Sequence, residues 1–324
     1  NRRNMTGKTI SIAALLSAMS ISLMAQHVVE QWHPVDISFE SSEAYANPFQ
    51  NVELSASFTG PGGMILTVPG FYKGGNTWMV RFSPVRPGNW KYTNISNDAQ
   101  LNNKTGTVTC VGNTQANVHG RLMVDPSNKH HFKYEDGTRF FLMGCEIDWL
   151  ALIEMQDPDL SKTKQIIDMY ARQGFNTVLM NAYAYDTRWR IRKTENDDWG
   201  PPLKHPWPGP HSNHDFSRLD TAYWNHFDKV LGYLFEKGMV AYIYFKVYKK
   251  LVNWPIRGSR NDELFFSSIV ARYQAYPGII WSFAKESYYE PEHAYIHKML
   301  DLIEEKDTYG RLRTTHDDNG RGED

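Results

Sequence analysis

The sequence predicts two domains of different class. Residues 28–118 are expected to form an all-β immunoglobulin-like sandwich, and residues 119–324 an α/β domain of the (β/α)8 TIM-barrel type. The first part alternates apolar and polar residues with a period of two, between turns rich in Gly and Pro. The second part alternates short apolar runs with amphipathic segments of helical length. With 324 residues, 41% of them hydrophobic, the chain can bury a sizeable core.

Residues 1–25 are typical of a signal peptide and are set apart from the fold. Lys8 follows Met5, an apolar run covers residues 10–24, and Ala25 comes after it. This is the order of charge, apolar stretch and small residue found in secretory signals. The run is too short to cross a membrane stably. We therefore expect an exported protein, secreted or periplasmic, without a membrane span.

Composition excludes some partners and favours others. The formal net charge is -1 and no run of Lys or Arg is present, so a nucleic acid backbone has no basic surface to bind. Aromatic residues make up 14% of the chain, and loop Trp and Tyr suit a surface that stacks on sugar rings. The only two cysteines, Cys110 and Cys145, fall in different predicted domains, so we expect free buried thiols.

The sandwich prediction depends on three alternating segments, which cover residues 52–58, 77–82 and 106–111. Gly-rich or Pro-rich turns separate them, as expected for an antiparallel sandwich. No cluster of catalytic side chains is present in this part. We expect a packing or spacing domain, with glycan binding as the alternative.

Past residue 118, four strand–helix units follow one another and a fifth strand begins. The predicted strands cover residues 139–145, 175–180, 239–245, 279–284 and 312–315, and the predicted helices cover residues 159–173, 220–237, 262–276 and 292–306. A closed barrel needs about 250 residues, so we expect only about the first half of a barrel, in a C-terminally truncated chain. The alternative is a complete, doubly wound sheet, but no Gly-rich phosphate loop marks the crevice of such a fold.

The fourth predicted strand ends in Lys285 and Glu286. Pro277 and Gly278 end the preceding helix, and the short apolar run after them is typical of a strand buried on both faces. A carboxylate is not expected inside such a strand. Both charges should therefore lie at its C-terminal end, where barrels of this type place their chemistry.

Polar and aromatic side chains also follow the other predicted strands. These candidate ligand-binding residues are Asp148, Trp149, Asn181, Tyr183, Lys246, Tyr248, His316 and Asp317. Asn, Asp and His hydrogen-bond hydroxyl groups, while Trp and Tyr stack on apolar faces. Each has a structural alternative, because a Trp or Tyr at a strand end also packs in cores and an Asp there caps the next helix.

A long insertion over residues 183–216 is expected to be an ordered wall or lid on the same face. It contains Trp189, Trp199, Trp207, His205, His211 and His214 together with several prolines. His211, His214 and Asp215 are of metal-ligand type, but without helical context we favour solvated or hydrogen-bonded histidines, and expect no metal or cofactor. A metallohydrolase of the amidohydrolase kind would need two histidines after the first strand, where Glu146 and Asp148 stand instead.

Three motifs follow the signal peptide in order: Val-Pro-Gly-Phe-Tyr at 68–72, Arg-Phe-Ser-Pro at 81–84 and Asp-Gly-Thr-Arg-Phe-Phe at 136–141. With the order of the domains, they resemble bacterial glycoside hydrolases that have an apiosidase-like catalytic barrel behind an immunoglobulin-like domain. The resemblance implies a retaining clan A enzyme acting on a plant or algal polysaccharide or oligosaccharide.

The resemblance also implies roles for particular residues. In that clan the acid/base glutamate closes the fourth strand, which is Glu286 here, and an Asn usually precedes it where this chain has Lys285. A cation at that position suits an acidic or sulfated sugar as substrate. The second carboxylate of the retaining mechanism ends the seventh strand, so we expect it beyond residue 324 and expect these residues alone to be inactive. In a complete chain, the partner would be Asp148, Asp317 or Asp318.

A second functional class remains open. A carbohydrate-binding surface or periplasmic protein that retains the barrel but has lost activity would have the same domains, and Lys285 is compatible with it. A seventh strand that ends in Glu would favour the enzyme, and its absence would favour the binding protein.

Overall fold

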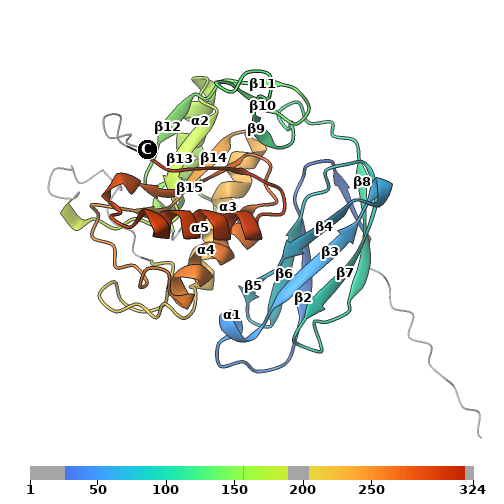
Figure 1. The fold of residues 1–324 in the computed structure, drawn as a ribbon, viewed down its shortest axis with the longest axis horizontal. Coiled ribbons are helices and arrows are strands. Elements are labelled where there is room, and N and C mark those ends of the chain that lie inside the picture. Colours follow the sequence, from blue (N-terminus) through green and yellow to red (C-terminus); the bar gives the residue numbers. More distant parts are fainter. Residues whose placement is uncertain (1–25, 156, 189–203, 318–324) are drawn as a thin grey trace, which may run out of the picture.

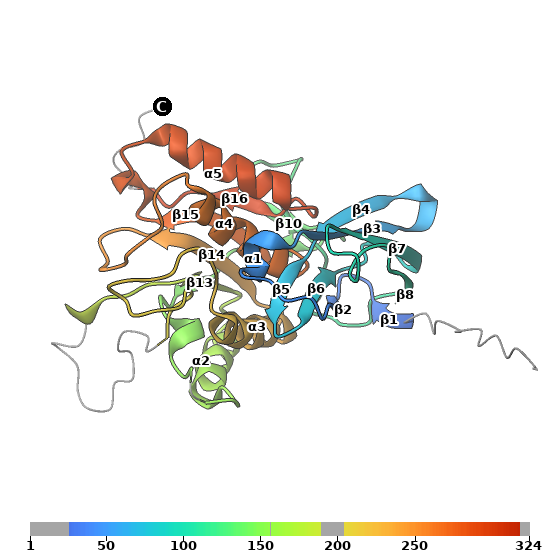
Figure 2. The same ribbon diagram turned by 90° about the horizontal axis from the view of Figure 1, so that it is seen from below.

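The computed structural model describes residues 26–155, 157–188 and 204–317 (Figure 1). The predicted signal peptide, as well as Trp189, Trp199 and Asp318, lie outside the described residues. Figure 2 shows the N-terminal β-domain on one side of the molecule and the helices α2 to α5 on the other. Within the described residues, no helix combines the length and the apolar character required to cross a membrane.

The N-terminal domain consists of two β-sheets. One has the strand order β1-β8-β7-β3-β4 and the other the order β2-β6-β5. Their elements are β1 (Gln26–Glu30), β2 (Val35–Glu40), α1 (Pro48–Asn51), β3 (Leu54–Thr59), β4 (Ile65–Pro69), β5 (Phe71–Gly74), β6 (Thr77–Phe82), β7 (Gly88–Ser96) and β8 (Thr105–Val111).

The two sheets pack face to face around one apolar core, which agrees with the predicted sandwich. Phe58 of β3 stacks on Phe82 of β6 with 3.7 Å between ring centroids, and Trp90 of β7 packs against Phe82. The pairing is antiparallel except that β1 runs parallel to β8. Cys110 in this domain and Cys145 in the next are buried and free, as predicted.

The second domain contains a parallel sheet whose spatial order, β12-β13-β14-β15-β16, is the order of the sequence. Its elements are β12 (Gly144–Glu146), α2 (Ser161–Arg172), β13 (Thr177–Asn181), α3 (Thr221–Glu236), β14 (Val240–Val247), α4 (Arg260–Tyr273), β15 (Ile279–Lys285), α5 (His293–Lys306) and β16 (Leu312–Thr314). The strand order does not reverse among these strands, so the doubly wound alternative does not apply.

The helices all contribute to one core on the same face of this sheet. Ile167 of α2, Phe227 of α3, Phe266 of α4 and Met299 of α5 belong to a single apolar cluster with Ile243 of β14. Helices confined to one face of a sequentially ordered parallel sheet are what a (β/α) barrel requires.

The predicted strand over residues 139–145 is divided in the structure. Three short strands, β9 (Leu122–Val124), β10 (Phe132–Tyr134) and β11 (Arg139–Phe140), form a separate antiparallel sheet, and only β12 joins the parallel one. The cause is a hairpin turn in which Gly137 adopts φ +93°, which returns the chain so that Phe140 pairs with Phe132. Phe140 then packs on Val240 and Ile280 at the N-terminal end of the parallel sheet.

A buried charge cluster joins the two domains. Arg81 of β6, 3% exposed, lies 2.7 Å from Asp36 and donates 2.8 Å to the carbonyl oxygen of Arg272 in α4. Asp228 of α3 accepts from Arg272 and Lys73, both at 2.7 Å. Burial alone would raise the pKa of Asp228, but the charges of Arg272 and Arg81 outweigh it and lower that pKa well below its ordinary value.

Candidate functional site

Polar side chains meet at the C-terminal ends of β12, β13 and β15. The ammonium group of Lys285 contacts Glu146 and lies 2.8 Å from Asp148 Oδ1. Asn181 Nδ2 donates 3.0 Å to the same oxygen, and Lys250 Nζ lies 3.9 Å from Asp148 Oδ2. These five residues are called the strand-end cluster below.

The parallel register explains why residues so distant in sequence meet. Cys145 of β12 pairs with Val178 of β13, and Val247 of β14 pairs with Lys285 of β15. Both pairs of strands are parallel. The C-terminal ends of neighbouring strands therefore lie at one edge of the sheet, as predicted from the polar residues that follow the apolar runs.

Lys285 is paired inside the protein. Burial opposes its positive charge, but hydrogen bonds to Asp148 and Glu146 outweigh burial and raise the pKa of Lys285 above its ordinary value. Its side chain is 14% exposed. The structure thus shows an ammonium group paired with two carboxylates, and its contact with an acidic or sulfated sugar stays a prediction.

Glu286 follows β15 directly and adopts the left-handed conformation, with φ +58° and ψ +44°. Its backbone N–H donates 3.0 Å to His316 Nδ1, and the N–H and hydroxyl of Ser287 both donate to the carbonyl oxygen of His316. Within the described part of the chain, no hydrogen bond or ion pair engages the carboxylate of Glu286. A non-glycine residue with this φ costs about 1–3 kcal/mol and persists only where neighbours enforce it.

Tyr244 of β14 belongs to the same region and was not among the residues predicted from sequence. Its ring lies 5.5 Å from that of His316, and its hydroxyl is buried without a hydrogen-bond partner among the described residues. Burial raises the pKa of Tyr244, and the nearby charges of Glu146 and Asp148 add to the effect. Tyr244 lies on β14 two residues before Lys246, and this position near the end of a strand could have marked it as a candidate site residue.

Lys246 does not join the strand-end cluster. It is 3% exposed and lies 2.8 Å from Asp262 of α4, while its ammonium group donates 2.5 Å to the hydroxyl of Tyr295 in α5. The preceding residue, Phe245, also faces α4 by stacking on Phe266. Two consecutive side chains therefore face the helices, and the alternation of the strand is broken at its end.

The predicted aromatic residues that the structure describes, Trp149, Tyr183 and Tyr248, do not join the strand-end cluster either. Trp149 is 5% exposed and donates its indole N–H to the carbonyl oxygen of Ala184. Tyr183 is fully buried, and Tyr248 donates its hydroxyl to Glu290 at 2.5 Å. Asp317 is exposed, one residue beyond His316.

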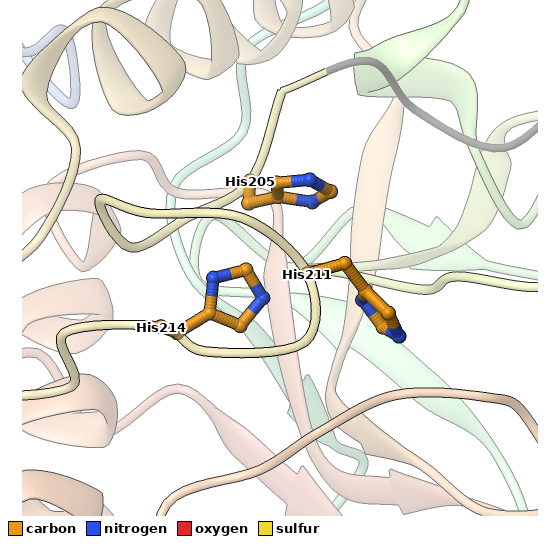
Figure 3. Close-up of side chains that lie close together, drawn as sticks. All are labelled: His205, His211 and His214. Carbon is orange, nitrogen blue, oxygen red and sulfur yellow. The ribbon is translucent and has the colours of Figure 1, made fainter.

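A second polar group lies in the loop between β13 and α3. His205, His211 and His214 lie so close that one ring nitrogen from each is within 4.8 Å of the others (Figure 3). Burial is the main cause that lowers the pKa of His214 to about 4. Asp215, the third residue of metal-ligand type noted with His211 and His214 in the sequence, pairs with Arg218 at 2.8 Å.

Two family models match the chain. A domain of unknown function, DUF5060, matches residues 28–97, and the apiosidase-like catalytic domain matches residues 126–323. No curated protein matches the chain.

Solved structures are similar as well. A candidate glycoside hydrolase from Bacteroides vulgatus is 26% identical, with a TM-score of 0.76 over 90% of this chain and 56% of that chain. The chain thus spans little more than half the length of that protein. A family 5 glycoside hydrolase from the same organism is 16% identical (TM-score 0.41, 61% of this chain, 40% of that chain). A family 5 mannosidase from Rhizomucor miehei is 13% identical (TM-score 0.46, 62% of this chain, 57% of that chain).

The β-rich N-terminal domain coincides with the first family match, and the parallel sheet with its helices coincides with the second. The second match extends over more than half of the chain. On this evidence, the chain belongs to the family of apiosidase-like catalytic domains, which is glycoside hydrolase-like, and a DUF5060 domain precedes its catalytic domain.

Proposed function

We propose that the protein cleaves a glycosidic bond in a plant or algal polysaccharide or oligosaccharide, by a retaining mechanism in which Glu286 is the general acid/base. Membership in a glycoside hydrolase-like family supports the reaction class. We further propose that its N-terminal domain is immunoglobulin-like, that its barrel continues beyond this chain, and that residues 1–25 direct its export.

The observation that carries the acid/base assignment is the geometry of Glu286. It closes the fourth parallel strand, is held in a left-handed turn by contacts with His316, and has a half-buried side chain whose carboxylate is not engaged by described residues. Because the side chain is only partly buried, a ligand can reach this carboxylate. One that is positioned but unpaired is suited to exchange a proton with a ligand.

Lys285 does not prevent this role. A neighbouring ammonium group would stabilise the ionised form of Glu286, whereas a general acid has to hold its proton at working pH. Lys285 instead contacts Glu146 and Asp148, whose two negative charges compensate its own. The residue that replaces the usual Asn is therefore directed towards Glu146 and Asp148, and among the described residues its ammonium group forms no ion pair with Glu286.

In a retaining mechanism Glu286 would first protonate the oxygen of the leaving group while a second carboxylate attacks the anomeric carbon. It would then remove a proton from the water that releases the covalent intermediate. Glu146 and Asp148 are both occupied by Lys285, so neither is assigned as the nucleophile. The resemblance to clan A enzymes assigns that role to a carboxylate beyond residue 324, and this assignment is part of the proposal.

The strand-end cluster would form the polar floor for the sugar. Asp148, Asn181 and Lys285 are held by one another, and His316 is held by the turn at Glu286. Preorganised donors and acceptors of this kind suit several sugar hydroxyls. The cluster equally suits a protein that binds carbohydrate without cleaving it, since each of its charges has an internal partner.

The Glu286→Gln variant of the full-length protein separates the two functions. The kcat/KM for substrates with poor leaving groups should fall by about 10²–10⁴-fold, while the kcat/KM for activated aryl glycosides, which form the intermediate without protonation of the leaving group, should stay close to its original value. Rates on both substrate classes are compared with those of Glu292→Gln, which changes an exposed glutamate six residues away. Equal losses on both classes would refute the acid role, and binding without turnover in the unmodified protein would identify a carbohydrate-binding protein.

A further inference from the structure

The loop between β13 and α3 contains an imidazole that lacks the partners a buried polar group needs. His214 is 7% exposed, and neither of its ring nitrogens has a hydrogen-bond partner among the described residues. Backbone groups of Gly209 and Pro208 interact with the ring and partly oppose the effect of its burial, but neither meets the geometry of a hydrogen bond to a ring nitrogen. Buried polar atoms without partners are rare in folded proteins and call for an explanation such as an ion.

Two more imidazoles converge on the same place. One ring nitrogen from each of His205, His211 and His214 lies within 4.8 Å of the others, and Figure 3 shows that all three rings come from this one loop. His211 also has a buried ring nitrogen, Nδ1, without a partner among the described residues. We propose that these three histidines bind a divalent transition metal ion of the zinc type.

The ligand set determines the class of ion. Neutral imidazole suits zinc, cobalt, nickel and copper, whereas magnesium and calcium require oxygen ligands. Zinc sites with three histidines leave the fourth tetrahedral position to water or another ligand. Ligand nitrogens at about 2.0–2.1 Å from zinc are about 3.3 Å apart in tetrahedral geometry, so the rings have to move closer together when the ion binds.

Tyr183 provides the support that a metal-binding histidine usually has. Its hydroxyl lies 2.7 Å from His205 Nδ1, which leaves Nε2 as the nitrogen available to the ion and fixes the orientation of the ring. Tyr185 stacks on His211 with 3.7 Å between ring centroids. Aromatic rings therefore restrict two of the three ligands.

The ion would connect this loop to the sheet beside the strand-end cluster. Tyr183 lies two residues after Asn181, the last residue of β13, and the carbonyl oxygen of Tyr185 accepts from the N–H of Leu251. The metal would therefore fix one wall of the candidate active site. This inference does not depend on glycoside hydrolysis, since metal binding is measured on the protein without any substrate.

The test uses the full chain, purified without a polyhistidine tag and freed of metal by chelation. Titration with zinc should show about one ion per chain, and cobalt should produce the visible absorption of a four-coordinate ion. Saturating zinc should also raise the Tm. The His211→Ala and His214→Ala variants should lose this binding, and Tyr183→Phe should weaken it about tenfold without abolishing it.

His297→Ala is the matched control, because His297 is an exposed histidine of α5 outside the group, and it should bind zinc as the unmodified protein does. Circular dichroism shows whether each variant is folded, and His211→Gln replaces His211→Ala if that variant is not. The proposal is overturned if the unmodified protein takes up no stoichiometric zinc or cobalt. It is also overturned if folded His211 and His214 variants bind zinc as tightly as the unmodified protein.

Discussion

His226 of α3 illustrates the cost of enclosing a titratable side chain. It is 7% exposed, and its Nε2 has no hydrogen-bond partner within the described ranges. Burial, with a smaller contribution from the charges of Lys229 and Lys204, lowers the pKa of His226 from 6.5 to about 4. The neutral ring is therefore the folded form at neutral pH.

We predict that the free energy of unfolding decreases as the pH is lowered from about 6.5 to about 4. In this window an unfolded histidine binds a proton while folded His226 does not, so each pH unit costs at most about 1.4 kcal/mol. Urea denaturation in the presence of a chelator measures this dependence. His226→Gln should reduce this slope, with the remainder due to other buried histidines such as His214, and His297→Gln, at an exposed site, should leave it unchanged. An unchanged slope in His226→Gln would contradict the prediction.

Lys246 and Lys285 show how far a single residue could be interpreted from sequence. Both lysines follow apolar runs, and both were predicted to contact the ligand. Lys285 does reach the cluster, but Lys246 binds Asp262 inside the helical layer. The difference arises where the alternation of β14 ends, and it depends on groups of α4 and α5 that no local pattern in β14 contains.

At the scale of elements, the turn after β15 is fixed from outside the strand. Glu286 N–H donates to His316 Nδ1, and Ser287 donates twice to the carbonyl oxygen of His316. His316 lies two residues beyond β16. The segment that follows β16 therefore determines the position of the Glu286 carboxylate, which follows the neighbouring strand β15.

We predict that His316→Phe lowers kcat of the full-length enzyme while the protein stays folded. Phe removes the acceptor for the Glu286 N–H, a loss of about 0.5–1.5 kcal/mol of stability, and lets the left-handed turn relax. His316→Asn, whose amide oxygen can accept the same bond, should recover much of kcat. The readouts are kcat, KM and Tm, with Asp301→Ala at an exposed position of α5 as the control. Equal kcat in the Phe and Asn variants would exclude a positioning role.

Most elements were predictable to within a few residues, because apolar runs and Gly stops are local signals. The helix expected over residues 220–237 is α3 (Thr221–Glu236), and the strand expected over 77–82 is β6. The strand expected over 139–145 was not correct. Its apolar residues belong to two different sheets. The hairpin turn at Gly137, which brings Phe140 into the antiparallel sheet, was overlooked.

At the scale of the molecule, Asp228 is the shared partner of charges from both domains. Arg81 and Lys73 approach it from the sandwich, and Arg272 approaches it from α4. Because its pKa is lowered, the carboxylate contributes stability above its ordinary value of 3.8 and loses it only as the pH falls through the lower folded value. The interface should therefore withstand mild acid.

We predict that Asp228→Ala separates the unfolding of the two domains. The variant leaves two buried guanidinium groups without their common carboxylate, at a cost of about 3–5 kcal/mol. Calorimetry should then show two transitions where the unmodified protein shows one. Asp301→Ala, on the exposed side of α5, should leave the curve unchanged. A single transition with unchanged Tm in Asp228→Ala would show that the interface does not depend on this pair.

The sequence indicated the order of the two domains, the parallel sheet and the edge where polar side chains meet. It did not indicate that Arg81, within a motif used for the resemblance, connects the domains. It also did not indicate that His205, and not Asp215, joins His211 and His214. Such contacts join residues whose proximity is decided by loop paths and domain packing.

The strand-end cluster has one more consequence. Two negative groups, Glu146 and Asp148, stand against two positive groups, Lys285 and Lys250, so its charges sum to zero. A group without net charge exerts little attraction beyond the Debye length of about 8 Å at physiological ionic strength. Even charged oligosaccharides should thus receive no long-range attraction from the cluster, and added salt should scarcely alter their rate of association.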